Sequence, residues 1–337
     1  MLYSLFKPLL FAVDAELAHE VSLEMLNQFK FLVAEVRIDK PKQVMGIQFP
    51  NSVGLAAGLD KNGDYLPGLS KLGFGFIEVG TVTPRAQDGN PRPRLFRLIR
   101  NRSIINRMGF NNRGVDHLLH QLPERPRSYV LGINIGKNLA TPVDKALSDY
   151  QAGLQKVYQQ ADYISVNISS PNTPGLRKLQ TEAALDALLH GIDETRKSLQ
   201  DLHQFNRPIA LKVSPDLDDE AIPAIADLVC KHGIDALIAT NTTLDRTAVA
   251  GHRLAGESGG LSGEAIIEKS RHALSQFHQV LKGEIPIISV GGINSATEAQ
   301  LRLDLGASLV QVYTGLIFQG PGLVQEIAQA LAPGIPD

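Results

Sequence analysis

Cysteine is almost absent from this chain of 337 residues, which contains only Cys230. A disulfide within the chain is therefore impossible, and a metal cluster held by cysteines is excluded. Cys230 ends an apolar stretch with a helical pattern, which is typical of a small hydrophobic residue buried in a core. A single cysteine also agrees with a protein that works in a reducing compartment.

Long apolar runs and an excess of charge of one sign are also missing. No run approaches the roughly 20 residues that a membrane-spanning helix requires. The stretch Leu9–Val13 is followed at once by Asp14 and Glu16, which is unlike a secretory signal. The formal net charge is −2, so bulk electrostatics give no reason to expect nucleic-acid binding. The absence of an arginine-rich leader favours a bacterial source over a mitochondrial precursor.

Apolar runs rich in β-formers recur along the chain and predict its architecture. Hydrophobic residues make up 43% of the sequence, enough for one large core or for two ordinary domains. Most of the runs lack polar alternation, as expected for parallel strands buried on both faces. With helical patterns between them, they predict a (β/α)8 TIM barrel over residues 41–337. The runs are Val53–Ala57, Phe76–Val79, Val130–Ile135, Tyr163–Val166, Ile209–Val213, Ala236–Ala239, Ile287–Val290 and Leu309–Tyr313.

A doubly wound open sheet is the alternative architecture. It normally carries a glycine-rich dinucleotide turn after its first strand, and the stretch Gly58–Gly63 lacks the G-x-G-x-x-G spacing. The helical patterns between the runs fit either arrangement. They cover Glu182–Gln200, Asp219–His232, Ala265–Val280, Ala296–Leu305 and Leu323–Ala330.

Two segments do not fit a plain barrel. Residues 94–106 are predicted to form a hairpin inserted after the second strand. Residues 1–40 are predicted to form two amphipathic helices, the second capped by Asp14. The second helix carries Glu16, Glu20 and Glu24, so it is not the basic helix typical of anionic lipid surfaces. A lid on the barrel and an interfacial hairpin for a membrane or an apolar substrate both fit this pattern. The apolar positions are Leu2, Leu5, Phe6, Leu9, Leu10 and Val13, then Leu17, Val21, Met25 and Phe29.

The predicted strand ends carry amides, hydroxyls and two lysines, Lys61 and Lys212. Carboxylates are scarce there and histidines are absent, which argues against a metal hydrolase and against a glycosidase with paired carboxylates. The set suits a planar heterocycle with carbonyl and N–H edges. Gly291–Gly292 and Thr314–Gly315 follow the last two strands, where TIM barrels bind phosphate on backbone N–H groups. Tight turns are the other explanation for these glycines.

The loop Asn167–Gly175 is the most informative stretch. It follows the strand Tyr163–Val166 and contains Pro171 and Pro174, each of which fixes its own φ and restricts the residue before it. Amides and hydroxyls are thus held on a stiff mount at a strand end. This pattern indicates a binding or catalytic loop rather than a solvent-exposed turn.

These motifs resemble the dihydroorotate dehydrogenase family over essentially the whole chain. Ser170 stands where the soluble branch has cysteine, and together with the N-terminal helices it resembles the quinone-dependent, membrane-associated class 2. No position that the family uses departs from its pattern. The matching stretches are Gly54–Lys61, Glu78–Thr83, Asn106–Asn112, Asn167–Arg177, Leu211–Pro215, Thr240–Thr243, Gly259–Gly263 and Val290–Ile293.

The resemblance implies bound FMN and oxidation of (S)-dihydroorotate to orotate in pyrimidine synthesis. Ser170 matches the catalytic base, helped by a bound water and the Thr173 hydroxyl, and Lys212 matches a residue beside the flavin pyrimidine edge. Matches to substrate-binding positions are Lys61, Asn106, Arg107, Met108, Gly109, Phe110, Asn167, Asn172, Asn241 and Thr242. Matches to FMN positions are Ala56, Ala57, Gly58, Lys61, Thr81, Asn134, Asn167, Lys212, Thr240, Gly263, Gly292, Tyr313 and Thr314.

The implied partners are a membrane quinone and the membrane surface, reached through residues 1–40. Class 2 further implies a peripheral position on the cytoplasmic side of a bacterial inner membrane, without an iron–sulfur partner subunit and without a metal. A phosphate-binding isomerase barrel without flavin explains the glycines but not the Ser170 loop. A barrel that only docks at membranes explains only the N-terminal helices. A flavin absorption spectrum separates both from the flavoenzyme.

Overall fold

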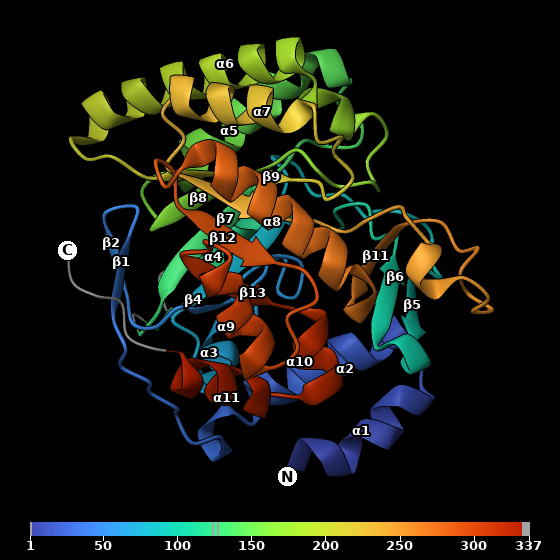
Figure 1. Ribbon diagram of the computed structural model, residues 1–337. Helices are drawn as coiled ribbons and strands as arrows, with labels where there is room; N and C mark the ends of the chain where they lie inside the picture. The colour runs from blue at the N-terminus through green and yellow to red at the C-terminus, as the bar shows by residue number, and fades with distance from the viewer. Residues whose placement is uncertain (1, 123–124, 127, 332–337) are drawn as a thin grey trace.

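The computed structural model describes residues 2–122, 125–126 and 128–331, which form a closed barrel of parallel strands surrounded by helices (Figure 1). The barrel order is β10-β12-β13-β3-β4-β7-β8-β9, with each strand parallel to its neighbours. All eight predicted runs become barrel strands, and the TIM barrel is confirmed. The strands are β3 (Val53–Leu55), β4 (Phe76–Val82), β7 (Val130–Ile135), β8 (Tyr163–Asn167), β9 (Ile209–Val213), β10 (Ala236–Ala239), β12 (Ile287–Val290) and β13 (Leu309–Val312).

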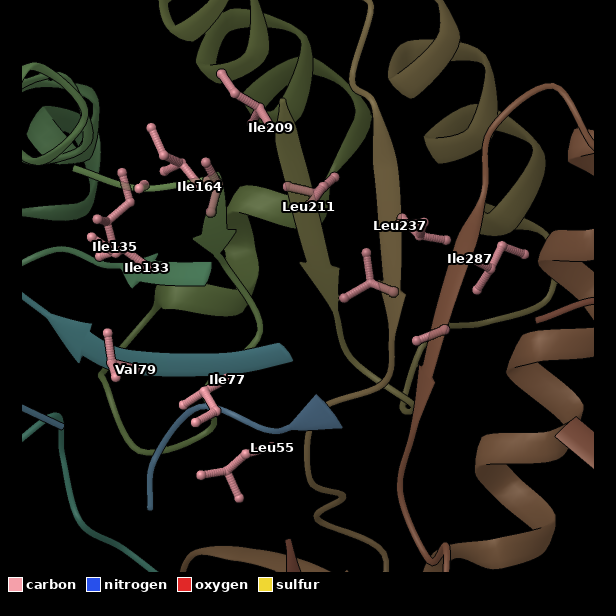
Figure 2. Close-up of a cluster of buried hydrophobic side chains, with 14 of the residues drawn as sticks. Leu55, Ile77, Val79, Ile133, Ile135, Ile164, Ile209, Leu211, Leu237 and Ile287 are labelled. Carbon is pink, nitrogen blue, oxygen red and sulfur yellow. The ribbon is translucent and has the colours of Figure 1, made fainter. Parts of the chain in front are cut away.

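Helices cover the outside of the barrel and bury its larger hydrophobic core. Successive residues of a strand face opposite sides, so alternate positions such as Ile77 and Val79 on β4 point toward the helices. Figure 2 shows Leu55, Leu211 and other buried side chains of this layer. The helices of the barrel are α3 (Leu66–Leu69), α4 (Val115–Gln121), α5 (Ala146–Val157), α6 (Glu182–His203), α7 (Ala221–Lys231), α8 (Ile267–Leu281), α9 (Ala296–Asp304), α10 (Thr314–Gln319) and α11 (Gly322–Ala330).

The inside of the barrel is apolar at the bottom and polar above. A small hairpin of β1 (Lys42–Val44) and β2 (Ile47–Phe49) closes the bottom, where Phe49 packs edge-on against Phe76 with ring centroids 5.3 Å apart. Above this layer lies Glu78, which is fully buried and accepts hydrogen bonds from Asn134, Tyr163 and Gln311 at 2.8–2.9 Å. The polar layer therefore lies directly beneath the strand ends, where the sequence predicts the site.

The predicted insertion at residues 94–106 is a hairpin of β5 (Leu95–Leu98) and β6 (Ser103–Asn106). The structure adds a third strand that the sequence did not predict, β11 (Gly260–Gly263), which pairs antiparallel with β6. The motif Gly259–Gly263 thus belongs to a small sheet beside the barrel mouth.

The N-terminal segment forms α1 (Leu2–Ala12) and α2 (Ala15–Gln28), with α1 low in Figure 1 and α6 at the top. Asp14 caps α2 as predicted, accepting hydrogen bonds from the N–H groups of Glu16 and Leu17 at 2.9 and 3.0 Å. The polar side of α1 contacts the barrel at α10, where Lys7 donates to the Phe318 carbonyl at 2.7 Å. Among the described residues, none of the helices combines the length and the hydrophobicity needed to cross a bilayer.

Candidate active site

A cavity opens at the carboxyl ends of the barrel strands, between the small sheet, α2 and the loop Asn167–Gly175. It brings together most of the predicted site residues from segments far apart in the sequence. The predicted residues that line it are Ala56, Ala57, Gly58, Lys61, Thr81, Asn106, Met108, Gly109, Phe110, Asn167, Ser170, Asn172, Lys212, Thr240, Asn241, Thr242, Gly263, Gly292, Tyr313 and Thr314.

Two predicted site residues lie outside the cavity lining. The guanidinium of Arg107 pairs with Glu257 at 2.6 Å and stacks on the ring of Phe96, 4.5 Å from its centroid. The side chain of Asn134 is fully buried in the polar layer below, where it donates to Glu78 at 2.8 Å. Asn134 still reaches the cavity wall indirectly, because its Oδ1 accepts the hydroxyl hydrogen bond of Thr81.

Ser170 lies on the loop Asn167–Gly175 and is 6% exposed. Its Oγ accepts a hydrogen bond from the backbone N–H of Asn172 at 3.2 Å. Arg177 fixes the base of the loop, donating to the Ser169 carbonyl at 3.0 Å and to the Thr242 carbonyl at 2.8 Å. Asp216 pairs with the same guanidinium at 2.8 Å. The serine is therefore flanked by two hydrogen bonds, one from Arg177 to the residue before it and one from the N–H of Asn172 to its own hydroxyl.

Asparagine side chains at the mouth are held by one another and by neighbouring hydroxyls. Asn167 donates through Nδ2 to Thr81 at 2.9 Å, which leaves its Oδ1 to accept from Asn241 at 3.3 Å. Asn172 donates to Oδ1 of Asn106 at 3.2 Å. Because each amide has a partner, its oxygen and nitrogen have a defined direction. Such a set can discriminate the carbonyl and N–H edges of a planar ligand.

The two lysines of the strand ends face this cavity as predicted. Burial lowers the pKa of Lys61 to about 8, although the charges of Glu16 and Asp60 oppose the effect. Burial also lowers the pKa of Lys212, which is 5% exposed, and Glu78 opposes this shift. A buried ammonium without a close carboxylate is stabilised by an anionic or carbonyl-bearing ligand.

Glycines form the cavity wall opposite the loop Asn167–Gly175. Gly263 and Gly292 have φ of 93° and 81°, which L side chains rarely adopt. A Cβ at Gly292 would lie 2.4 Å from Cγ1 of Ile267, so no other residue fits there. Arg302 is fully buried behind this wall and donates to the Gly291 carbonyl at 2.8 Å. The backbone of the wall is thus held in one conformation.

Sequence reasoning missed three parts of this site. His19 of α2 lines the cavity, and burial and the nearby Lys61 lower its pKa to about 3, so it is neutral. Arg302 and Arg177, which hold the wall and the loop, were not assigned roles. No local signal identifies these two arginines, because each donates to the backbone carbonyl of a different element, Arg177 to Thr242 and Arg302 to Gly291.

Comparisons with known proteins agree on one family. A family model described as "Dihydroorotate dehydrogenase" matches residues 41–334. A protein of Thiobacillus denitrificans named "Dihydroorotate dehydrogenase (quinone)" is 55% identical, with 98% of this chain and 100% of the relative covered. A protein of Chromobacterium violaceum with the same name is 54% identical, with 98% of each covered. A crystal structure of DHODH from Eimeria tenella in complex with ferulenol has a TM-score of 0.88 at 36% identity, covering 94% of this chain and 90% of that one.

Proposed function

Because the chain belongs to the dihydroorotate dehydrogenase family, we propose that its cavity holds FMN and (S)-dihydroorotate and that Ser170 removes a substrate proton. The reaction is that of its quinone-dependent relatives, in which dihydroorotate is oxidised to orotate in pyrimidine biosynthesis and a quinone accepts the electrons. The two quinone-dependent relatives named above come from bacteria. When bound, FMN supplies the redox chemistry that side chains lack.

The residues of the cavity suit a flat ring system that carries a phosphate. The wall of Gly263 and Gly292 supplies backbone N–H groups without a Cβ, as phosphate sites of TIM barrels do. Lys212 and the amide of Asn167 suit a ring edge that carries carbonyl oxygens. These residues support the proposal that the cofactor is FMN. A barrel isomerase without flavin leaves Lys212 and the amides unused.

Ser170 needs help as a base, since a serine hydroxyl with an ordinary pKa holds its proton firmly. The N–H of Asn172 points at Oγ from 3.2 Å and stabilises the negative charge that develops as the proton leaves. Lys61 is positioned to bind the substrate carboxylate, and Asn172 and Asn106 to fix the ring plane. Further assistance from Thr173, which is 3% exposed, stays a prediction.

One observation carries this proposal: Ser170, Lys61 and Lys212, which follow or end three different barrel strands, line one cavity together with the glycine wall. The identity of the cofactor is tested by denaturing the purified protein and separating the released flavin by chromatography. FMN in a ratio near one per chain is expected. FAD, or the absence of any flavin from protein expressed with excess riboflavin, contradicts the proposal.

The pKa of Lys61 predicts how binding of orotate depends on pH. The ammonium is present below about pH 8 and is lost above it, so the affinity for an anionic carboxylate is full below this pH and falls as the pH rises through it. Beyond the pKa the loss approaches about tenfold for each pH unit. Titration of the bound flavin's absorbance with orotate between pH 6.5 and 9.5 measures it. In Lys61→Met the affinity for orotate is expected to be weak and independent of pH. If the affinity of the unaltered protein is equally independent of pH, Lys61 does not bind the carboxylate.

We further propose that α1 and α2 form the route for the quinone and the contact with the membrane. Their outer face exposes large apolar side chains, among them Leu5 at 72%, Leu9 at 67% and Met25 at 51%. Phe31 and Leu32, which follow α2, are 76% and 72% exposed. An apolar surface of this size is stabilised by lipid or another apolar partner. The attachment is peripheral, on the cytoplasmic face of the inner membrane.

Three serines in place of Leu5, Leu9 and Leu32 are expected to release the protein from lipid vesicles and to reduce turnover with a long-chain quinone. Burial of one leucine side chain contributes about 1.5–3 kcal/mol to the free energy of binding. Loss of even part of this contribution at three positions therefore lowers vesicle binding tenfold or more. Turnover with a small soluble acceptor should change less than twofold. Leu202→Ser is the matched control, since Leu202 is 71% exposed and belongs to α6, which lies at the opposite end of the molecule from α1 (Figure 1). Equal loss with both acceptors shows that the helices are a structural lid.

A further inference from the structure

Glu16 is a buried carboxylate on a helix that otherwise turns its charges outward. Its side chain is 4% exposed, whereas that of Glu20, one turn further along α2, is 49% exposed. The main partner of Glu16 is Arg94, itself 8% exposed, which donates through Nη2 to Oε1 at 2.7 Å and through Nε to both carboxylate oxygens at 3.1 Å. Arg92, whose side chain is 60% exposed, adds a contact to Oε1 at 3.0 Å. A buried pair of this kind is costly to break, because the remaining charge loses its compensation.

The other end of the same guanidinium holds the loop before β5. Nη1 of Arg94 donates to the carbonyl of Asp88 at 2.6 Å and to that of Asn90 at 2.8 Å. Arg94 thus uses one side of its planar group for α2 and the other for the barrel. A lysine, which has a single ammonium, cannot reproduce this fork.

Asn90 in turn contacts both predicted substrate loops. Its N–H donates to the Met108 carbonyl at 3.0 Å, and its Nδ2 donates to the carbonyls of Arg107 at 2.9 Å and Asn172 at 3.4 Å. The fit is tight, since a Cβ on Gly109 would lie 2.9 Å from Nδ2 of Asn90. The carbonyl of Arg94 adds a direct link by accepting the N–H of Arg107 at 2.9 Å.

From this chain of contacts we propose that Glu16 and Arg94 are positioning residues, through which the docking of α2 sets the affinity of the substrate loops for dihydroorotate and orotate. The inference rests on the proposed function, because it takes Met108 and Asn172 as parts of the substrate site. Neither Glu16 nor Arg94 touches the substrate. Coupling between two sites is reciprocal, so orotate in turn stabilises the docked position of α2.

Glu16→Gln tests the proposal, with Glu20→Gln as its control on the same helix. Glu20 pairs with the exposed Arg92, which also contacts Glu16, so this control removes a neighbouring charge and leaves the pair of Glu16 with Arg94 in place. We expect Glu16→Gln to weaken orotate binding and raise the KM for dihydroorotate by about tenfold, within the roughly 5- to 150-fold range of typical coupling. The FMN content and the rate of flavin reduction at saturating dihydroorotate should change less than about twofold. Glu20→Gln should change none of these quantities.

Hydrogen exchange of the α2 amides distinguishes a positioning role from a purely structural one, because only a positioning role makes exchange in α2 respond to orotate. In the unaltered holoenzyme, orotate is expected to slow exchange in α2, and in Glu16→Gln this response should disappear. If Glu16→Gln does not fold, Arg94→Lys keeps the charge but loses the fork, and the same loss of orotate affinity is expected. Normal orotate affinity in a folded Glu16→Gln protein overturns the proposal.

The variants Lys61→Met and Asn172→Ala test the proposed substrate site separately from the positioning role of Glu16 and Arg94. Both residues line the cavity, so each substitution should weaken orotate binding whatever α2 does. If they weaken binding and Glu16→Gln does not, only the positioning role is wrong. If neither of them has an effect, the substrate site itself has been misassigned.

Discussion

Ser170→Ala is expected to slow the reduction of the bound flavin by dihydroorotate by at least about 10²-fold, the usual loss when a general base is removed. The physical reason is that no other hydroxyl on the loop Asn167–Gly175 combines a place in the cavity wall with an N–H aimed at its oxygen. FMN should stay bound, because the glycine wall lies on the opposite side. Rapid mixing without oxygen measures the step free of the quinone reaction.

Two companion variants make the result specific. Ser170→Cys should retain part of the rate with an altered pH profile, because a thiol gives up its proton more readily than a hydroxyl. Ser262→Ala is the matched control, since Ser262 also lines the cavity but its hydroxyl bonds to Thr314 at 2.9 Å. A near-normal rate in Ser170→Ala removes this serine from the mechanism.

Lys212→Met is expected to lower the midpoint potential of the flavin and to weaken its binding. A buried ammonium beside the ring favours the reduced, more negative form, and a hydrogen bond to a charged group is worth about 1.5–3 kcal/mol. On the two-electron scale of about 30 mV for each 1.4 kcal/mol, the potential should fall by roughly 30–60 mV. Equilibration with a reference dye under reducing conditions measures the shift.

Lys137→Met is the control for this substitution. Lys137 is also buried, at 2% exposed, but its ammonium bonds to the carbonyls of Asn138 and Thr141, and it does not line the cavity. Lys212→Arg, which keeps the charge, should retain most of the potential. A Lys212→Met protein with its full FMN content and an unchanged potential contradicts the electrostatic role.

The barrel and most of the cavity could be predicted from the sequence because their signals are local. Parallel strands buried on both faces appear as unbroken apolar runs, and residues directly after them meet at one end of the barrel. Lys61, Ser170 and Lys212 are predicted in this way, and all three line the cavity.

The remainder depends on contacts between distant segments. β11 was missed because Gly260–Gly263 is a weak strand former that is stabilised by pairing with β6, some 150 residues earlier. Glu16 was grouped with Glu20 and Glu24 as polar helix surface, since the spacing of charges along a helix does not reveal which one finds a buried arginine 78 residues away. His19 was missed for the same reason, because it reaches the cavity from α2 and not from a strand end.

Anaerobic mixing of the purified holoenzyme with (S)-dihydroorotate tests the central claim most directly, that this cavity couples dihydroorotate oxidation to a bound flavin. The account predicts that the visible flavin absorbance bleaches fully before any quinone is added, with one equivalent of orotate formed for each flavin. Addition of quinone should then restore the absorbance. A protein whose flavin stays oxidised under excess dihydroorotate, while the same sample is reduced by dithionite, contradicts it.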